Sequence, residues 1–167
     1  MKIIPAARAI RFEQLEPGDL FLFVEHGTFA LKAKQKNAGA RNEMAVLGPN
    51  FLDGGGPFLL GWQATTVLSF GKYLSILLPS DPSAWSGVPG NPSQVSLAVG
   101  EQKKFIRVNG GSSPNHYVPC LVDIETGEIL ERQSPGHIIY TNVWEIAAVS
   151  SSHPPRTILK YPLPQGR

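Results

Sequence analysis

The sequence predicts an all-β protein made of two tandem small antiparallel units, either SH3-like β-barrels or meanders, that pack together. Three observations support this architecture: frequent chain breakers, short strand-forming runs between them, and a strand pattern that repeats in the second half. Among 167 residues there are 17 glycines and 15 prolines, which exceeds average usage and is too many for the helix interiors of a bundle. With 42% hydrophobic residues, we expect a packed core and many turns.

The first unit is predicted at residues 1–78 and opens with a turn into a strand. In the turn at 16–19, proline fixes φ and glycine can take a left-handed conformation. The apolar run at 20–24 and the return at 29–34 then form a hairpin. Further strands are expected at 44–47, 58–63 and 65–70.

The start of this unit carries the motif Phe-x-x-Leu-x-x-Gly-Asp-Leu-Phe at residues 12–21. This motif is similar to the opening of many small bacterial SH3-like barrels. The resemblance implies a turn that leads into a strand, and a bacterial source. It covers this motif alone and assigns no functional residue.

The second unit, predicted at residues 94–152, repeats the strand order of the first. A shift of 75 residues places Leu22 on Leu97 and Val24 on Val99. The same shift aligns further apolar pairs, with 31–33 on 106–108 and 46–47 on 121–122. An internal duplication leaves such a trace, because a strand pattern outlasts the identities of its residues.

Two segments outside the units are rich in chain breakers. Residues 79–93 contain four prolines and are predicted to form a stiff Pro/Gly/Ser-rich connector. Residues 153–167 are predicted to form an extended Pro-rich tail. The stretch 6–15 lies between two prolines and fits neither the helical nor the strand period, so its structure is left open.

The cellular location is predicted from an apolar window, the first residues and the cysteine content. The apolar window 58–78 is long enough to span a membrane, but Lys72 near its middle is costly there. We interpret this window as two buried strands joined at 71–72, without membrane association. The first residues lack the apolar stretch of a secretory signal, and the single Cys120 excludes an intramolecular disulfide. A cytoplasmic location is therefore expected.

Cys120, the single cysteine, follows His116 by four residues, and the two are weighed as a site for nucleophilic catalysis. A nucleophilic cysteine needs a nearby base to hold it as a thiolate, whereas residues four apart on a strand lie about 13 Å apart. Cys120 also lies in an apolar run, which favours a small buried residue. No catalytic residue is assigned, and a hydrolase with a Cys/His site is kept as an alternative.

Metal and cofactor sites are not predicted. The histidines lie singly along the chain, at His26, His116, His137 and His153. The acidic segment 123–128 fits a hairpin turn better than a calcium loop, because it lacks the twelve-residue pattern. The glycine run 54–56 precedes a strand and no Gly-Lys-Ser/Thr, so it is not a phosphate loop.

One basic stretch carries a possible binding function: Lys32, Lys34, Lys36 and Arg41 occur without an intervening acid. The three lysines alternate, so on one strand they project from the same face. Such a stripe can follow a phosphate backbone. Solvated edge-strand lysines that prevent sheet-to-sheet aggregation are the competing interpretation, and a net charge of +2 gives nucleic-acid binding little support.

The function predicted first is a non-catalytic interaction module that binds a protein partner or self-associates. Fold signals without a catalytic constellation favour this class. The first alternative is a nucleic-acid-binding small-barrel protein that uses the basic stretch. The second alternative is the hydrolase with a Cys/His site.

Overall fold

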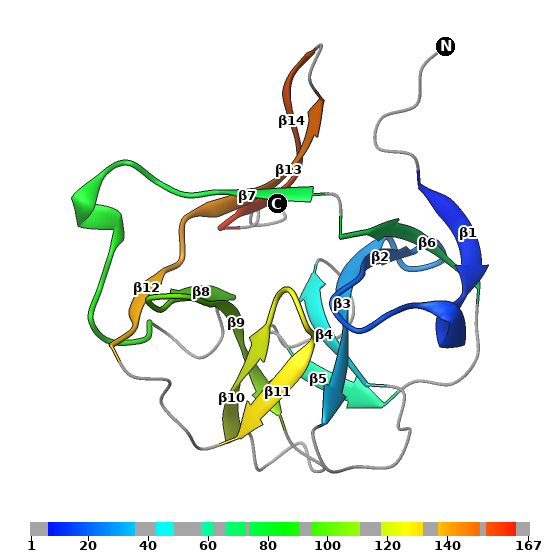
Figure 1. Ribbon diagram of the computed structural model, residues 1–167, viewed down its shortest axis with the longest axis horizontal. Coiled ribbons are helices and arrows are strands. Elements are labelled where there is room, and N and C mark those ends of the chain that lie inside the picture. Colours follow the sequence, from blue (N-terminus) through cyan, green and yellow to red (C-terminus); the bar gives the residue numbers. More distant parts are fainter. Residues whose placement is uncertain are drawn as a thin grey trace.

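Figure 1 shows the computed structural model of the chain. The structure describes residues 7–35, 43–48, 58–61, 66–72, 74–90, 95–110, 118–131, 137–150 and 153–162. The strands are β1 (Arg8–Arg11), β2 (Leu20–Phe23), β3 (Thr28–Gln35), β4 (Glu43–Gly48), β5 (Phe58–Gly61), β6 (Thr66–Gly71), β7 (Leu74–Leu77), β8 (Ser96–Val99), β9 (Lys104–Gly110), β10 (Val118–Asp123), β11 (Glu128–Glu131), β12 (Ile139–Thr141), β13 (Trp144–Ser150) and β14 (His153–Tyr161). Two 3-10 turns, η1 (Phe12–Gln14) and η2 (Pro82–Ala84), complete the described elements, and this part of the chain contains no α-helix.

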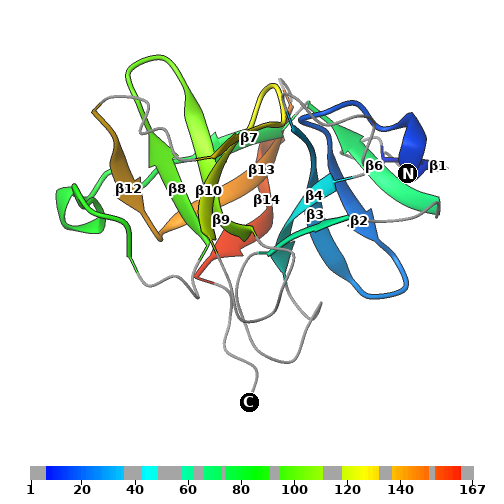
Figure 2. The ribbon, with the colours of Figure 1, turned by 90° about the horizontal axis from the view of Figure 1, so that it is seen from below.

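The strands form two sheets. The larger sheet has eleven strands and follows the order β1-β6-β2-β3-β11-β10-β9-β5-β4, with β8 and β12 attached through β9 and a further pairing of β3 with β4. The smaller sheet has the order β14-β13-β7, and Figure 2 shows it between the strands of the first half and those of the second. Both halves of the chain therefore share one hydrogen-bonded sheet.

The all-β class predicted from the sequence is confirmed, but two separate SH3-like barrels, one from each half, are not. The physical reason lies in two short parallel contacts between the halves. β11 pairs with β3, and β5 pairs with β9. Through these contacts, strands of one half have strands of the other half as neighbours, so the two halves form one sheet. The SH3-like description of each half is therefore not confirmed.

The antiparallel pairings of the two halves correspond. A residue of β2 or β4 has its counterpart 75 positions later, in β8 or β10, and a residue of β3 has its counterpart 77 positions later, in β9. With these shifts, residue pairs of the first half correspond to residue pairs of the second. For example, Leu31 opposite Ala45 becomes Val108 opposite Cys120. The predicted shift of 75 thus fits β2 and β4, while the strand between them needs two residues more.

A shared core lies between the halves, and the small sheet adds to it. Its residues include Leu20, Leu31, Ala45 and Leu47 from the first half and Val95, Val108, Cys120 and Val122 from the second. The rings of Trp144 and Tyr161 stack with centroids 4.3 Å apart. The Trp144 indole donates to the Val95 carbonyl over 3.4 Å, and the Tyr161 hydroxyl donates to the Leu47 carbonyl. The small sheet is thereby anchored to both halves.

A second cluster covers the outer face of the first half. It consists of Phe12, Leu15, Phe21, Phe23, Ala30, Met44, Val46 and Val67, with Ile10 packed against it. We call it the outer cluster. The Phe12 ring lies edge-on to Phe21 with centroids 5.4 Å apart. Because Phe12 belongs to η1, the stretch 6–15 that the sequence left open supplies a cover for β2 to β4.

The predicted connector and tail are described in part. Residues 82–84 form η2, and Ser86 forms an isolated bridge with Tyr140. Residues 153–161 form β14, whose hairpin with β13 extends away from the larger sheet (Figure 1). Residues 91–93 and 163–167, like the glycine run 54–56, lie outside the described residues.

Candidate functional site

The structure describes two members of the predicted basic stretch. Lys32 is 7% exposed, and its Nζ lies 3.8 Å from the centre of the Phe12 ring. Burial lowers the pKa of Lys32, and the charge of Glu13 opposes this shift. Lys34 Nζ lies 3.9 Å from Glu128 Oε1. Lys36 and Arg41 lie outside the described residues. The role of the four residues in nucleic-acid binding stays a prediction.

The two residues of the Cys/His alternative are not both described. Cys120 is buried in the shared core, where it lies opposite Val108 on the neighbouring strand. His116 lies outside the described residues. A buried thiol in apolar surroundings is disfavoured as a thiolate, so the packing role predicted for Cys120 agrees with its position.

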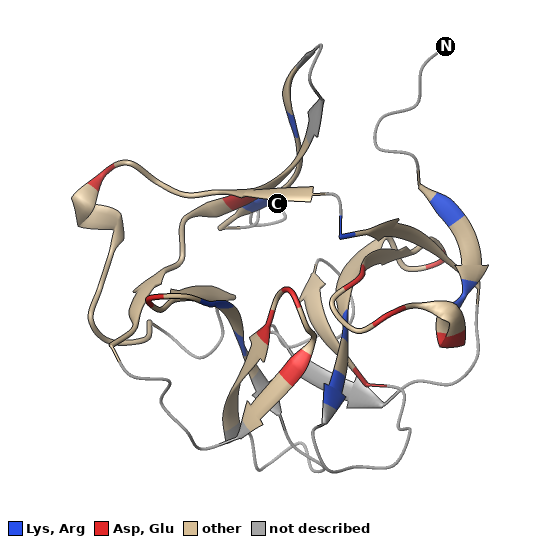
Figure 3. Cartoon of the chain, in the orientation of Figure 1, with Lys and Arg blue, Asp and Glu red and all other residues tan. Residues whose placement is uncertain are grey.

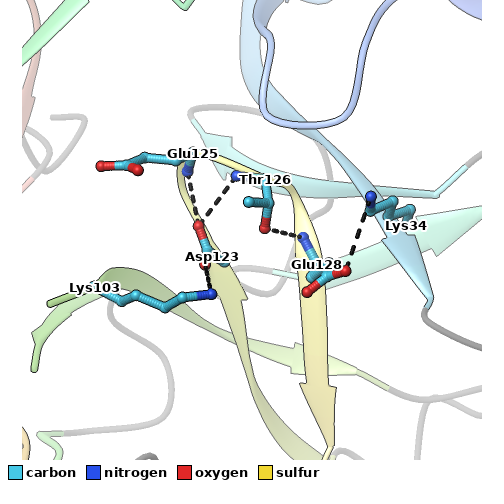
Figure 4. A network of polar contacts seen from close by, with 6 residues as sticks. All are labelled: Lys34, Lys103, Asp123, Glu125, Thr126 and Glu128. Atoms are coloured by element: carbon cyan, nitrogen blue, oxygen red, sulfur yellow. Dashed lines mark hydrogen bonds and ion pairs between the residues drawn. The ribbon is translucent and has the colours of Figure 1, made fainter.

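The acidic segment 123–128 forms the turn between β10 and β11, which confirms the predicted hairpin. The buried Asp123 carboxylate accepts hydrogen bonds from the backbone N–H groups of Glu125 and Thr126, over 2.9 and 3.1 Å (Figure 4). It also accepts one from Lys103 Nζ over 2.8 Å. Burial alone would raise the pKa of Asp123, but these hydrogen bonds outweigh it and lower the pKa. Asp123 is thus a structural carboxylate that holds the turn.

This turn meets the Pro-Gly turn of the first half. The Gly18 N–H donates to the Lys32 carbonyl over 2.9 Å, and the Gly127 carbonyl accepts from the Lys34 N–H over 2.8 Å. Both glycines have positive φ, at 92° and 68°. A Cβ on Gly127 would lie 2.6 Å from the Gly18 nitrogen. Only glycine therefore allows this contact between the halves.

A pocket of about 480 Å³ opens beside the two turns. All three parts of the molecule line it: β2 to β4 and the turn after β6 from the first half, β9 and the β10–β11 turn from the second, and β7 and β13 from the small sheet. The lining residues are Gly18, Leu20, Leu31, Leu47, Gly71, Lys72, Leu74, Ser75, Ile76, Lys104, Ile106, Ile124, Glu125 and Ile146. The volume falls within the range of about 300–1,000 Å³ found for small-molecule sites.

Two of the three charged residues in the described lining are exposed. These are Lys72 and Glu125, while Lys104 is half-buried like some of the leucines and isoleucines that form the walls. Lys72 Nζ lies 3.5 Å from Glu16 Oε2 at the surface. Lys104 forms no ion pair within the described part of the chain. In Figure 3, acidic positions also mark the turn between β10 and β11.

Sequence reasoning misses this pocket. Its walls come from segments scattered from Gly18 to Ile146, so no local motif announces it. The sequence predicts the turn at Gly18 and the turn at Gly127, but only as two separate local features. In the sequence, Lys72 stands out only as an obstacle to membrane insertion, and Lys104 belongs to no motif. Their convergence depends on the pairing of the halves, which residue types alone do not specify.

Comparisons of the chain with protein-family models, curated proteins and solved structures return no match. Among the described residues, no three His, Cys, Asp or Glu side chains gather so that they could hold a metal ion. The same residues include no helix with the length and apolar character needed to cross a membrane.

Proposed function

We propose that this chain is a non-catalytic binding module and that the pocket at the junction of the two halves is its ligand site. One observation carries the proposal: the pocket has apolar walls from all three parts of the molecule and only three charged side chains in its described lining. Sites for small molecules have this character, with a few polar groups that orient the ligand. The burial of Cys120 in the shared core favours this class over the hydrolase.

A neutral apolar fluorophore, N-phenyl-1-naphthylamine, tests the proposal without assuming the ligand's charge. We expect saturable binding at one site, because the probe gains fluorescence on leaving water for the apolar walls. Leu74→Trp places a larger side chain in the pocket lining and should abolish binding. Leu78→Trp is the matched control, since Leu78 is exposed and lies outside the lining.

Thermal unfolding must first show that both tryptophan variants fold, and Ile124→Trp provides a second pocket-filling variant if Leu74→Trp does not. Absence of saturable binding to the wild type would overturn the proposal. Equal binding by a folded Leu74→Trp protein would overturn it as well.

A protein partner or a second copy of the chain, as predicted from the sequence, remains the second candidate. An apolar surface favours it: Val88, Ile139 and Val143 are 68%, 48% and 43% exposed. The bridge between Ser86 and Tyr140 brings the connector to β12, so these residues belong to neighbouring segments. Light scattering should show an oligomer that Ile139→Lys dissociates. A monomer at all concentrations, with no partner recovered in pull-downs, would contradict this candidate.

Two other predictions from the sequence, the internal duplication and the cytoplasmic location, also stay proposals. The corresponding pairings of β2 to β4 and β8 to β10, together with the reciprocal parallel contacts, support an internal duplication. A cytoplasmic location stays an expectation drawn from the sequence.

A further inference from the structure

We infer that the pocket takes a single-chain amphiphile with an anionic head group, of which a fatty-acid carboxylate is the simplest example. The inference rests on the proposed function and names the class of ligand for the same site. It follows from the composition of the described walls, the charged residues among them and the poor fit of this lining to other ligand classes.

The walls fit a flexible aliphatic chain. Eight of the described lining residues are leucine or isoleucine, namely Leu20, Leu31, Leu47, Leu74, Ile76, Ile106, Ile124 and Ile146. The described lining contains no aromatic ring, so these residues offer a nucleobase or another flat ring no stacking platform. Ser75 supplies the only side-chain hydroxyl among these lining residues. A sugar buried here would leave most of its hydroxyls without partners, which is costly.

The charges fit an anionic head. The described lining contains two lysines, Lys72 and Lys104, and one acidic residue, Glu125. Lys104 has no ion pair within the described residues, and the Lys72–Glu16 pair joins side chains that are 44% and 78% exposed. An exposed pair of this kind is weak, so Lys72 can turn to a bound anion at little cost. A cationic head would instead meet two like charges.

The two lysines come from different halves. Lys72 lies in the turn between β6 and β7, and Lys104 begins β9. An anion held between them would bridge the halves at the edge of the shared core. Because such a ligand binds the folded chain and not the unfolded one, it should also raise the unfolding temperature as its concentration increases.

Displacement of N-phenyl-1-naphthylamine by matched amphiphiles tests the inference at neutral pH. Dodecanoate should bind at least about fivefold more tightly than dodecanol, because only the carboxylate pairs with the lysines. Tetradecanoate should bind about tenfold more tightly than dodecanoate if the pocket still accommodates the added methylenes. Dodecylammonium should bind more weakly than dodecanol.

Lysine variants locate the head group. Lys72→Gln and Lys104→Gln should each weaken dodecanoate binding about fivefold and leave dodecanol binding unchanged. Lys160→Gln is the matched control, because Lys160 is exposed on β14 and lies outside the pocket. It should change neither affinity.

The outcomes separate the two claims. If dodecanol binds as tightly as dodecanoate, or if both lysine variants bind dodecanoate like the wild type, the anionic head group is wrong and the pocket remains a binding site. If neither the fluorophore nor any amphiphile binds, the proposed function fails together with the inference.

Discussion

In the first half, the outer face of the sheet carries Phe21 and Ala30, whereas the corresponding positions of the second half carry Ser96 and Arg107. The inner faces of the two halves are alike in kind: Leu31 and Val108, for example, occupy corresponding positions and both lie in the shared core. Inner faces must fit each other across one interface, so both stay apolar. Outer faces meet different covering segments, which leaves their chemistry free to diverge.

The covers differ accordingly. Phe12 and its neighbours seal the first half with apolar side chains. In the second half, Arg107 Nη1 donates to the carbonyl of Gly90, which lies in the connector, over 3.3 Å. One half is thus closed by apolar burial and the other by a polar contact. Burial of a large side chain stabilises a protein more than one hydrogen bond does. Removal of the apolar cover should therefore lower the free energy of unfolding more than removal of the polar contact.

Phe12→Ala tests the apolar cover and should have the largest effect. Phe12 is fully buried between Phe21, Phe23 and the Lys32 ammonium. Its removal should lower the free energy of unfolding by about 3–5 kcal/mol, measured by urea denaturation. Val24→Ala, at an exposed site, should change it by less than about 0.5 kcal/mol. A loss below about 1 kcal/mol for Phe12→Ala would show that the outer cluster is not a second core.

Gly127→Ala tests the contact between the halves. Gly27 provides the control, because it also has positive φ but a Cβ added there would meet no atom within 4 Å. Gly27→Ala should cost about 1 kcal/mol from the left-handed backbone alone. Gly127→Ala should cost about 3 kcal/mol, because its Cβ also meets the backbone of Gly18 and Lys32. Equal losses in thermal unfolding would mean that the two turns do not pack together.

Asp123→Asn tests the polar support of the second half through its pH dependence. The folded-state pKa of Asp123 lies below the ordinary value of 3.8, so its stabilisation is present above that value and is lost as pH falls through the lowered pKa. The variant should lose about 2 kcal/mol at neutral pH, and the deficit should shrink steadily under acid conditions. A deficit that stays constant down to about pH 2 would contradict the role of the ionised carboxylate.

Arg107→Met tests the polar cover and should have the smallest effect. Methionine keeps the apolar stem of the side chain but cannot donate to the Gly90 carbonyl. We expect a loss of about 1 kcal/mol and faster proteolysis within residues 85–90. Protection of the connector equal to that of the wild type would show that the hydrogen bond does not hold it.

Local chemistry made part of this structure predictable. Pro17 and Gly18 define a turn by their own backbone preferences, and the strand pattern located β2 to β4 and β8 to β10. The alternation of Lys32 and Lys34 correctly suggested one face of a strand. It could not show that Phe12, far away in sequence, covers that face. The pocket likewise depends on which strands pair across the halves, and parallel contacts as short as those of β5 and β11 leave no sequence pattern.

Isoleucine methyl NMR, recorded during a titration with dodecanoate, shows whether a ligand binds in the pocket between the two halves. Signals of Ile76, Ile106, Ile124 and Ile146 should shift together along one saturation curve, because all four line the pocket. Ile10 packs on the outer cluster and Ile139 is exposed on β12, so their signals should stay in place. Shifts confined to Ile10 or Ile139, or no saturable shift at any pocket isoleucine, would contradict a ligand site between the two halves.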